Sequence, residues 1–297
     1  MIYIGRELNI PVYSGIALMG SNLARLYSFP VKTYVFQSGE KNKNFRTLED
    51  LLVFMADCKL CRSDYLYAVG GGVTADIGGL AAALYNRGMK LINVPTTLTA
   101  MVDASIGGKN AVNLSEGKNL VGTFKQPDDI YIDLNYLDTL PKRIYNEGMA
   151  EVIKYSFICG EDLTTLPLEE MVKKCVEIKE EFVRKDEFDL GERHILNFGH
   201  TIGHAVENDS NYSYLHGESV AIGMVYITQI FNPDLLPRLK EMLGRFDLPT
   251  EYGGSIDFSL DKKRNGDSID IVIPKAFGDC EIQTIKTEEL NRLCKLT

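Results

Sequence analysis

The histidines of this 297-residue chain are concentrated in one segment. Only four are present, His194, His200, His204 and His216, and the last three each stand next to a glycine. His200 and His204 are four residues apart, so a helix would place both rings on one face. Catalytic zinc commonly takes three protein ligands, and two histidines with a glutamate are an established set. The spacing therefore predicts a divalent-metal site built on His200 and His204, with Glu151 or His216 completing it, although spacing alone does not fix the ligands.

Glu151 is a candidate because of its surroundings. The segment MAEVIKY (149–155) places Glu151 and Lys154 three residues apart on one face of an expected helix. An exposed ion pair is the ordinary interpretation of such a spacing. The neighbours Val152, Ile153 and Tyr155 are apolar, however, and predict that the helix is buried. A buried carboxylate needs a strong partner, and a metal ion is one.

Two glycine-rich segments have the composition of anion sites. VGGGVTADIGG (69–79) predicts a strand, a glycine turn and the start of a helix, where backbone N–H groups can receive a phosphate. It matches neither the G-x-G-x-x-G fingerprint nor a P-loop, so a tight structural turn is the alternative. VPTTLTAMVDASIGGKNAVNLSEGKNL (94–120) places Lys109 and Lys118 in glycine loops. Solvated lysines are the ordinary interpretation, and an anion site is the functional one.

The elements that must position these residues follow from periodicity. YLYAV (65–69) and KLINV (90–94) predict buried strands on either side of a small-residue helix, DIGGLAAALYN (76–86). Strand, helix, strand is the repeating unit of a parallel sheet covered by helices. The pattern changes near IYIDLNYLDTLPKR (130–143) and is mostly helical until a late strand, SIDIVIP (268–274). We therefore expect an α/β domain over 1–140 and a helix-rich domain over 141–297.

Composition excludes several classes of protein. The chain is 45% hydrophobic and 25% charged, which is typical of a globular protein with a full core. Its net charge of −9 argues against nucleic acid as a partner. No apolar run approaches the roughly 20 residues of a membrane span, and the N-terminus lacks the pattern of a signal peptide. A lone C-x-x-C, Cys58 to Cys61, is a weak metal or redox signal. We expect reduced cysteines and a cytoplasmic protein.

Taken together, the motifs resemble those of the 3-dehydroquinate synthase family within the sugar-phosphate cyclases. They run in order from SGEKNKNF at residue 38 to the segment ending near residue 282, and include GGGVTADIGG, PTTL, VDASIGGK, GKNLVGTF, DTLP, GMAEVIKY, RHILNFGHTIGHAVE and LHGESVAIGM. The resemblance implies an N-terminal NAD-binding α/β domain with a parallel sheet, a helical C-terminal domain and an active site in the cleft between them. It also implies a homodimer.

The resemblance implies a role for individual residues. The metal, zinc or cobalt, would be held by Glu151, His200 and His216, so His204 would face the substrate and take part in proton transfer. Other catalytic positions correspond to Lys109, Lys154, Asp103 and Asn119. Substrate-binding positions correspond to Arg87, which would come from the neighbouring subunit, and to Lys179, Arg193, Asn197 and Lys262. Cofactor-binding positions correspond to Glu40, Lys43, Gly71, Gly72, Val73, Thr74, Ala75, Asp76, Thr96, Thr97, Lys109, Lys118 and Thr139.

The chemistry implied by the family accounts for these residue types. The substrate, 3-deoxy-D-arabino-heptulosonate 7-phosphate, is an anionic sugar phosphate. In the family's mechanism NAD oxidises one hydroxyl and is regenerated after phosphate is eliminated, so it acts as a catalyst. The metal polarises the hydroxyl as a Lewis acid.

Two features depart from the family pattern. GEKNK begins at Gly39, and we expect that a strand–helix piece is lacking before it, together with the aspartate that ends the family's ribose-binding strand. We therefore expect weaker binding of NAD. Asp189 stands where the family tends to have glutamate.

Three alternatives remain at this point. Another sugar-phosphate cyclase is disfavoured by the intact set Asn119, Lys179, Asn197 and His204. A metal-dependent polyol dehydrogenase has no use for so many bases directed at phosphate. A shortened, non-catalytic binding relative would have no chemical need for the metal ligands. Phosphate release from the heptulosonate phosphate separates all three from a dehydroquinate synthase.

Overall fold

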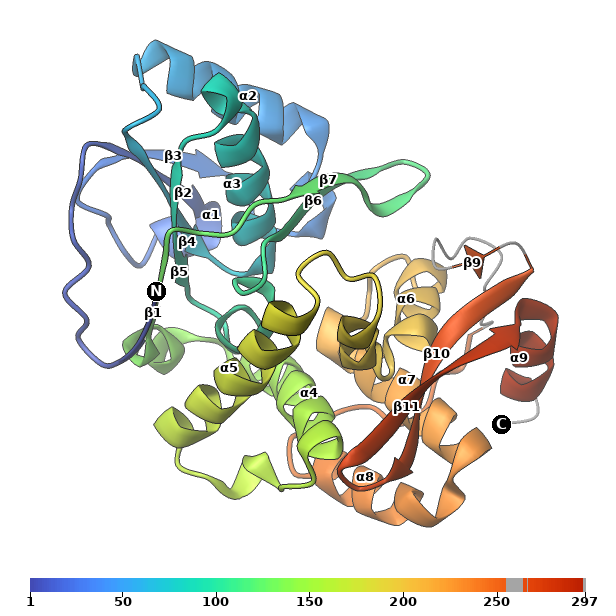
Figure 1. Cartoon of the computed structure of the whole chain (residues 1–297). Coiled ribbons are helices and arrows are strands. Elements are labelled where there is room, and N and C mark those ends of the chain that lie inside the picture. The colour runs from blue at the N-terminus through green and yellow to red at the C-terminus, as the bar shows by residue number, and fades with distance from the viewer. Residues whose placement is uncertain (255–263, 266, 296–297) are drawn as a thin grey trace. The chain divides into compact units, whose positions relative to one another are not determined.

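The computed structural model describes residues 1–254, 264–265 and 267–295, with side chains throughout except at 264–265. The chain forms two compact units, Met1–Pro141 and Lys142–Thr297 (Figure 1). Within the described residues, no helix combines the length and the apolar character that a bilayer span requires.

Unit 1 is built on a six-stranded parallel sheet in the order β1-β8-β5-β4-β2-β3. The strands are β1 (Ile2–Gly5), β2 (Gly15–Gly20), β3 (Lys32–Phe36), β4 (Tyr65–Gly70), β5 (Lys90–Pro95) and β8 (Asp129–Asp133). The strands expected at 65–69 and 90–94 are confirmed as β4 and β5. The chain passes from β2 to β3 in one direction and then returns to β4 on the other side of β2. Parallel sheets bind ligands at the carboxyl ends of the strands beside such a reversal.

Helices cover one face of this sheet. α2 (Phe45–Asp57) and α3 (Gly72–Leu84) bury Leu48, Leu51, Ile77 and Leu80 against apolar side chains of β2, β4 and β5. The expected helix at 76–86 is confirmed as α3, and it begins four residues earlier because Gly71 is its N-cap. On the other face the short α1 (Ser21–Ala24) and the η4 turn (Leu134–Thr139) contribute to an aromatic-rich layer around Tyr67.

The segment before Glu40 does contain a strand–helix unit. β2 pairs with β3 and β4 inside the sheet, and α1 follows it directly. α1 is only four residues long, and the expected loss of a longer piece of the family's nucleotide domain stays a prediction. β2 ends at Gly20, and no Asp or Glu occurs between Glu7 and Glu40.

The remaining elements of unit 1 are short. The η1 turn (Glu40–Asn42) precedes α2, and the η2 turn (Tyr85–Arg87) joins α3 to β5. After β5 a π-helical turn, η3 (Ala100–Ala104), leads into the antiparallel hairpin of β6 (Lys109–Leu114) and β7 (Gly117–Phe124). Figure 1 shows this hairpin passing beside α3 and projecting sideways from the unit.

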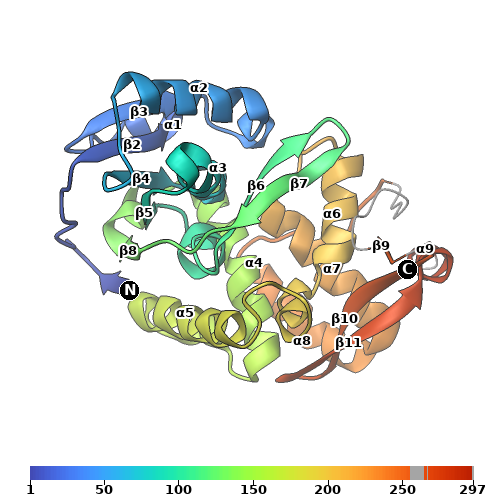
Figure 2. The same ribbon diagram turned by 45° about the horizontal axis from the view of Figure 1, so that its top comes forward.

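Unit 2 is mostly helical, as expected. Its helices are α4 (Lys142–Cys159), α5 (Leu168–Lys185), α6 (His200–Asp209), α7 (His216–Phe231), α8 (Leu236–Gly244) and α9 (Thr287–Cys294), with turns η5 (Leu163–Thr165), η6 (Glu192–Asn197) and η7 (Pro233–Leu235). The late strand is confirmed as β10 (Ser268–Ala276), which pairs antiparallel with β9 (Arg264–Asn265) and β11 (Asp279–Lys286) (Figure 2).

The core of unit 2 brings α4, α6, α7, α8 and β10 together. α6 and α7 approach closely because glycines face each other across their contact. A Cβ on Gly223 would lie 1.9 Å from the carbonyl oxygen of Gly199, and Gly199 itself has a φ of +78°. These two positions therefore require glycine, and they fix the place where α6 begins at His200.

Candidate metal centre and nucleotide-binding edge

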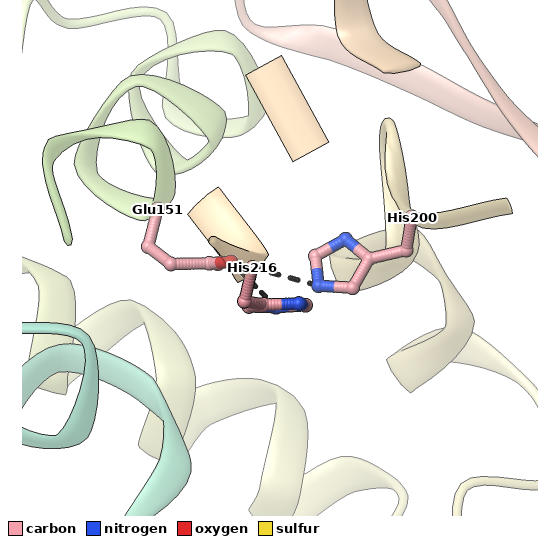
Figure 3. Close-up of side chains that lie close together, drawn as sticks. All are labelled: Glu151, His200 and His216. Atoms are coloured by element: carbon pink, nitrogen blue, oxygen red, sulfur yellow. Dashed lines mark ion pairs between the residues drawn. The ribbon is translucent and has the colours of Figure 1, made fainter. Parts of the chain in front are cut away.

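Three residues from three helices of unit 2 form a candidate metal centre. Glu151 lies on α4, His200 opens α6 and His216 opens α7, and one ligand atom of each lies within 4.8 Å of the others. The Oε1 atom of Glu151 is 3.6 Å from Nε2 of His200 and 3.4 Å from Nε2 of His216 (Figure 3). Ligands about 2.1 Å from a tetrahedral ion lie about 3.4 Å apart. These residues therefore fit a divalent metal such as zinc or cobalt.

Backbone contacts position His216 beside Glu151. Gly217 donates its backbone N–H to Oε2 of Glu147, 3.0 Å away, and Glu147 lies one turn before Glu151 on α4. A Cβ at position 217 would lie 1.8 Å from the Glu147 carbonyl oxygen, so only glycine allows this approach. Glu218 accepts the backbone N–H of Leu215 at 2.8 Å and caps the start of α7. The first turn of α7 is thus held against α4.

The charges of the centre favour a cation. Glu151 is fully buried, and its Oε2 atom forms an ion pair with Lys154, which is itself 1% exposed. The predicted burial of this pair is confirmed. Burial lowers the pKa of His216, but the carboxylates of Glu207 and Glu151 outweigh it and raise that pKa to about 10. A pocket that stabilises an imidazolium this strongly also stabilises a metal cation.

His204 lies beside the centre. Its ring centroid is 5.7 Å from that of His200 and 6.1 Å from that of His216. The expected helical pair is therefore present on α6. Geometry also groups His204 with Glu207 and His216 as a second candidate set of ligands. Because both sets use His216, the two are alternatives for one ion, and distance alone does not choose between them.

The predicted substrate-binding residues of unit 2 are largely buried. Lys179 lies on α5, and Arg193 and Asn197 lie on the η6 turn that leads to His200. Arg193 is 1% exposed and donates through Nη1 to the carbonyl oxygen of Glu187 at 2.8 Å. Its Nε and Nη2 atoms have no hydrogen-bond partner among the described residues. A buried guanidinium whose N–H donors are not all used is suited to binding an anionic ligand. Lys262, also predicted to bind substrate, lies outside the described residues.

The predicted cofactor residues of unit 1 lie along the carboxyl ends of the strands. Gly71 to Asp76 follow β4 and form the first turns of α3, while Thr96 and Thr97 follow β5. Among the residues that the structure describes, no side chain caps the N-terminus of α3. Its first N–H groups are thus available to a phosphate, as a dinucleotide requires. Thr139 ends η4, and its hydroxyl is 2.8 Å from that of Tyr27.

A buried polar network joins the hairpin to this edge. Lys43 is 5% exposed, forms an ion pair with Asp76 on α3 and donates to Oδ1 of Asn119 on β7. Burial raises the pKa of Asp76, against the lowering effect of Lys43. Glu40 lies 3.6 Å from Nζ of Lys118 in the same network. Five residues predicted from the resemblance are thus brought together.

The other predicted residues of unit 1 occupy distinct places. Asp103 lies in the π-helical turn η3, a rare conformation that is frequent at functional sites. Lys109 opens β6 and is exposed. Arg87 is exposed in a turn where three successive residues have positive φ, Asn86, Arg87 and Gly88. This turn precedes β5 and so lies at the amino edge of the sheet, opposite the cofactor residues.

Sequence reasoning missed two residues of the metal centre's surroundings, Glu147 and Glu207. Glu147 precedes Glu151 by four residues, and Glu207 follows His200 by seven. Both spacings place the carboxylate on the same helical face as the predicted ligand, and this signal could have identified them.

Comparisons with known proteins identify the family of the chain. Residues 33–147 match the family model described as 3-dehydroquinate synthase N-terminal, and residues 148–264 match that described as 3-dehydroquinate synthase C-terminal. The 3-dehydroquinate synthase of Clostridium acetobutylicum is 42% identical over 288 residues, which cover 89% of this chain and 81% of the relative.

Solved structures show the same fold. A 2-deoxy-scyllo-inosose synthase complexed with carbaglucose-6-phosphate, NAD⁺ and Co²⁺ is similar, with a TM-score of 0.83 and 25% identity over 95% of this chain and 90% of that one. A 2-epi-5-epi-valiolone synthase from Streptomyces hygroscopicus, with NAD⁺ and Zn²⁺ bound, has a TM-score of 0.85 and 22% identity over 100% of this chain and 95% of that one.

Proposed function

The chain belongs to the 3-dehydroquinate synthase family, and on that premise we propose that it converts 3-deoxy-D-arabino-heptulosonate 7-phosphate into 3-dehydroquinate and phosphate. The enzyme is a carbon–oxygen lyase of aromatic biosynthesis. The observation that carries the proposal is the cluster of buried Glu151 and His200 with partly buried His216, because its donor atoms have the separation that a divalent metal requires.

The chain has residues that suit both a divalent metal and NAD. Zinc or cobalt would be held by Glu151, His200 and His216. NAD would be held by the residues predicted to bind the cofactor: Gly71 to Asp76, Thr96, Thr97, Glu40, Lys43, Lys118, Lys109 and Thr139. When bound, the metal supplies a Lewis acid for a substrate hydroxyl, and NAD supplies a reversible hydride acceptor. Glycines at the start of α3 let a phosphate approach the backbone there.

The chain's own residues bind the substrate and move its protons. Arg193 and Lys179 are buried cations that would neutralise the carboxylate and phosphate of the sugar, with Asn197 and Lys262 as further contacts. His204 would hold or transfer a proton during the loss of phosphate, because its ring lies beside the centre without belonging to the ligand set that includes Glu151. Lys154, Asp103, Lys109 and Asn119 complete the catalytic set.

Sequence identity favours this substrate over those of related cyclases, in addition to the intact set of residues described above. The chain is 42% identical to a dehydroquinate synthase, but 25% and 22% identical to the inosose and valiolone synthases. We also propose a cytoplasmic homodimer.

A substrate panel tests this proposal. Purified protein with NAD and Co²⁺ should release phosphate from the heptulosonate phosphate far faster than from other sugar phosphates. Faster release from another sugar phosphate would identify a different cyclase, and no release from any would favour a binding relative.

A further inference from the structure

Glu207 is a buried acid that the mechanism above does not use. It lies on α6, three residues after His204, and is 2% exposed. Its Oε1 atom is 3.4 Å from Nδ1 of His216. A carboxylate buried this deeply beside an imidazole has a strong electrostatic effect on it, since the local dielectric constant is low.

His216 has one carboxylate at each ring nitrogen. Its Nε2 atom lies 3.4 Å from Oε1 of Glu151, and its Nδ1 atom lies 3.4 Å from Oε1 of Glu207. A neutral imidazole carries one N–H donor and one lone pair, so the group at one nitrogen decides what the other can do. If Nδ1–H donates to Glu207, Nε2 is the nitrogen whose lone pair can bind a metal held beside Glu151.

The ring of His200 has the same arrangement. Its Nδ1 atom is 3.2 Å from the carbonyl oxygen of Phe198, and its Nε2 atom is 3.6 Å from Oε1 of Glu151. A carbonyl oxygen only accepts hydrogen bonds, so Nδ1 of His200 carries a proton and Nε2 is the ring nitrogen left to bind a metal through its lone pair. Both rings therefore present Nε2 to the same carboxylate oxygen.

The shared arrangement of His200 and His216, an acceptor at Nδ1 and Glu151 beside Nε2, distinguishes the two possible ligand sets. In the set of Glu151, His200 and His216, every imidazole has an acceptor behind its Nδ1 atom, as metal-binding histidines usually do. In the set of His204, Glu207 and His216, the carboxylate would itself be a ligand and the Nδ1 contact would be lost. The first arrangement keeps both Nδ1 contacts, that of His200 with Phe198 and that of His216 with Glu207.

We propose that Glu207 is a positioning residue: it accepts the Nδ1–H of His216 and so fixes the tautomer and ring orientation in which Nε2 binds the metal. The proposal rests on the metal centre of the proposed function. The Glu207 carboxylate accepts the Nδ1–H of His216, as the Phe198 carbonyl accepts that of His200. Its negative charge also strengthens His216 as a ligand.

Cobalt binding to metal-free protein tests the proposal without requiring catalysis. Glu207→Ala should bind Co²⁺ about 10- to 100-fold more weakly than wild type and lose it faster to a chelator. Glu207→Gln keeps an acceptor oxygen of the same reach, so it should recover part of this loss and keep the wild-type visible spectrum of bound Co²⁺. Glu180→Gln, which removes one exposed carboxylate from α5, is the charge-matched control and should bind Co²⁺ like wild type.

The outcomes separate the possible failures. Wild-type affinity in both Glu207 variants would overturn this proposal and leave the metal centre intact. Complete loss of Co²⁺ from Glu207→Gln, equal to that of Glu151→Gln, would overturn it by making Glu207 a ligand. Wild-type protein that binds no Co²⁺ would overturn the proposal together with the metal centre.

Discussion

At the scale of single residues, the environment of each histidine differs although both lie on α6. His200 is buried and directs Nε2 at Glu151, whereas His204 is partly exposed and lies beside the centre. A spacing of four residues predicted that the two rings share one face, but it could not show which ring binds the metal and which faces the substrate. That assignment depends on Glu151, which comes from a helix about fifty residues earlier in the chain.

We expect alanine at these two positions to have different effects. His200→Ala removes a ligand and should lower metal affinity severely, because each coordinate bond contributes several kcal/mol. His204→Ala should keep the metal and lower turnover by about 10² to 10⁴. Bound metal and turnover are measured for both variants at one metal concentration. A metal-free His204→Ala beside a metal-loaded His200→Ala would contradict the assignment.

Replacing Arg193 with methionine should raise the stability of the fold and weaken the binding of substrate. Methionine removes a buried guanidinium that has two donors unpaired among the described residues, so the free energy of unfolding should rise by about 1–4 kcal/mol. The same change removes charge-assisted hydrogen bonds to the substrate, and its dissociation constant should increase about 10- to 100-fold.

Denaturant titration and calorimetric titration of the substrate measure the two effects. Arg184→Met, on the exposed surface of α5, is the matched control and should change neither quantity much. A destabilised Arg193→Met with unchanged substrate affinity would mean that Arg193 has a purely structural role.

At the scale of elements, the metal centre depends on how closely α6 and α7 pack. Gly223→Ala would place a Cβ 1.9 Å from the Gly199 carbonyl oxygen. The helices must separate, which should cost about 1–3 kcal/mol of unfolding free energy and weaken metal binding by moving His200. Gly244→Ala is the control, because a Cβ there would meet no atom of the described part of the chain within 4 Å. Equal stability and metal affinity in both variants would contradict this explanation.

The elements themselves were predictable where the pattern was strong. β4, α3 and β5 followed from apolar runs around a small-residue helix, and α4 from the apolar neighbours of Glu151. The strand β2 was missed because GIALMG has glycine at both ends and the helix after it has only four residues. The contact of His216 with Glu151 was not predictable from spacing, since it depends on the packing of α7 against α4.

At the scale of the whole molecule, Arg87 tests the proposed homodimer. α3 has 13 residues, so at 1.5 Å per residue it extends about 20 Å from Gly71 at one edge of the sheet toward Arg87 at the other. An arginine on the opposite edge suits the active site of a neighbouring subunit better than the cofactor edge of its own unit.

Mixing two inactive variants should therefore restore activity. A mixed dimer of Arg87→Ala and His204→Ala contains one site with both residues intact, and random re-association should give about a quarter of wild-type turnover. The mixture is assayed after subunit exchange, beside each variant alone. No recovery, with exchange verified by mass, would place Arg87 and His204 in sites of the same subunit or make the protein a monomer.

The central claim is that this chain is a metal-dependent lyase in which NAD acts as a catalyst. The most direct measurement supplies cobalt-loaded protein with one equivalent of NAD and excess heptulosonate phosphate, and then quantifies phosphate and 3-dehydroquinate. We predict that the two products form in equal amounts, exceed the NAD many-fold and fall to background in the presence of a chelator. Absence of phosphate release, or product formation that stops at one per NAD, would contradict the account.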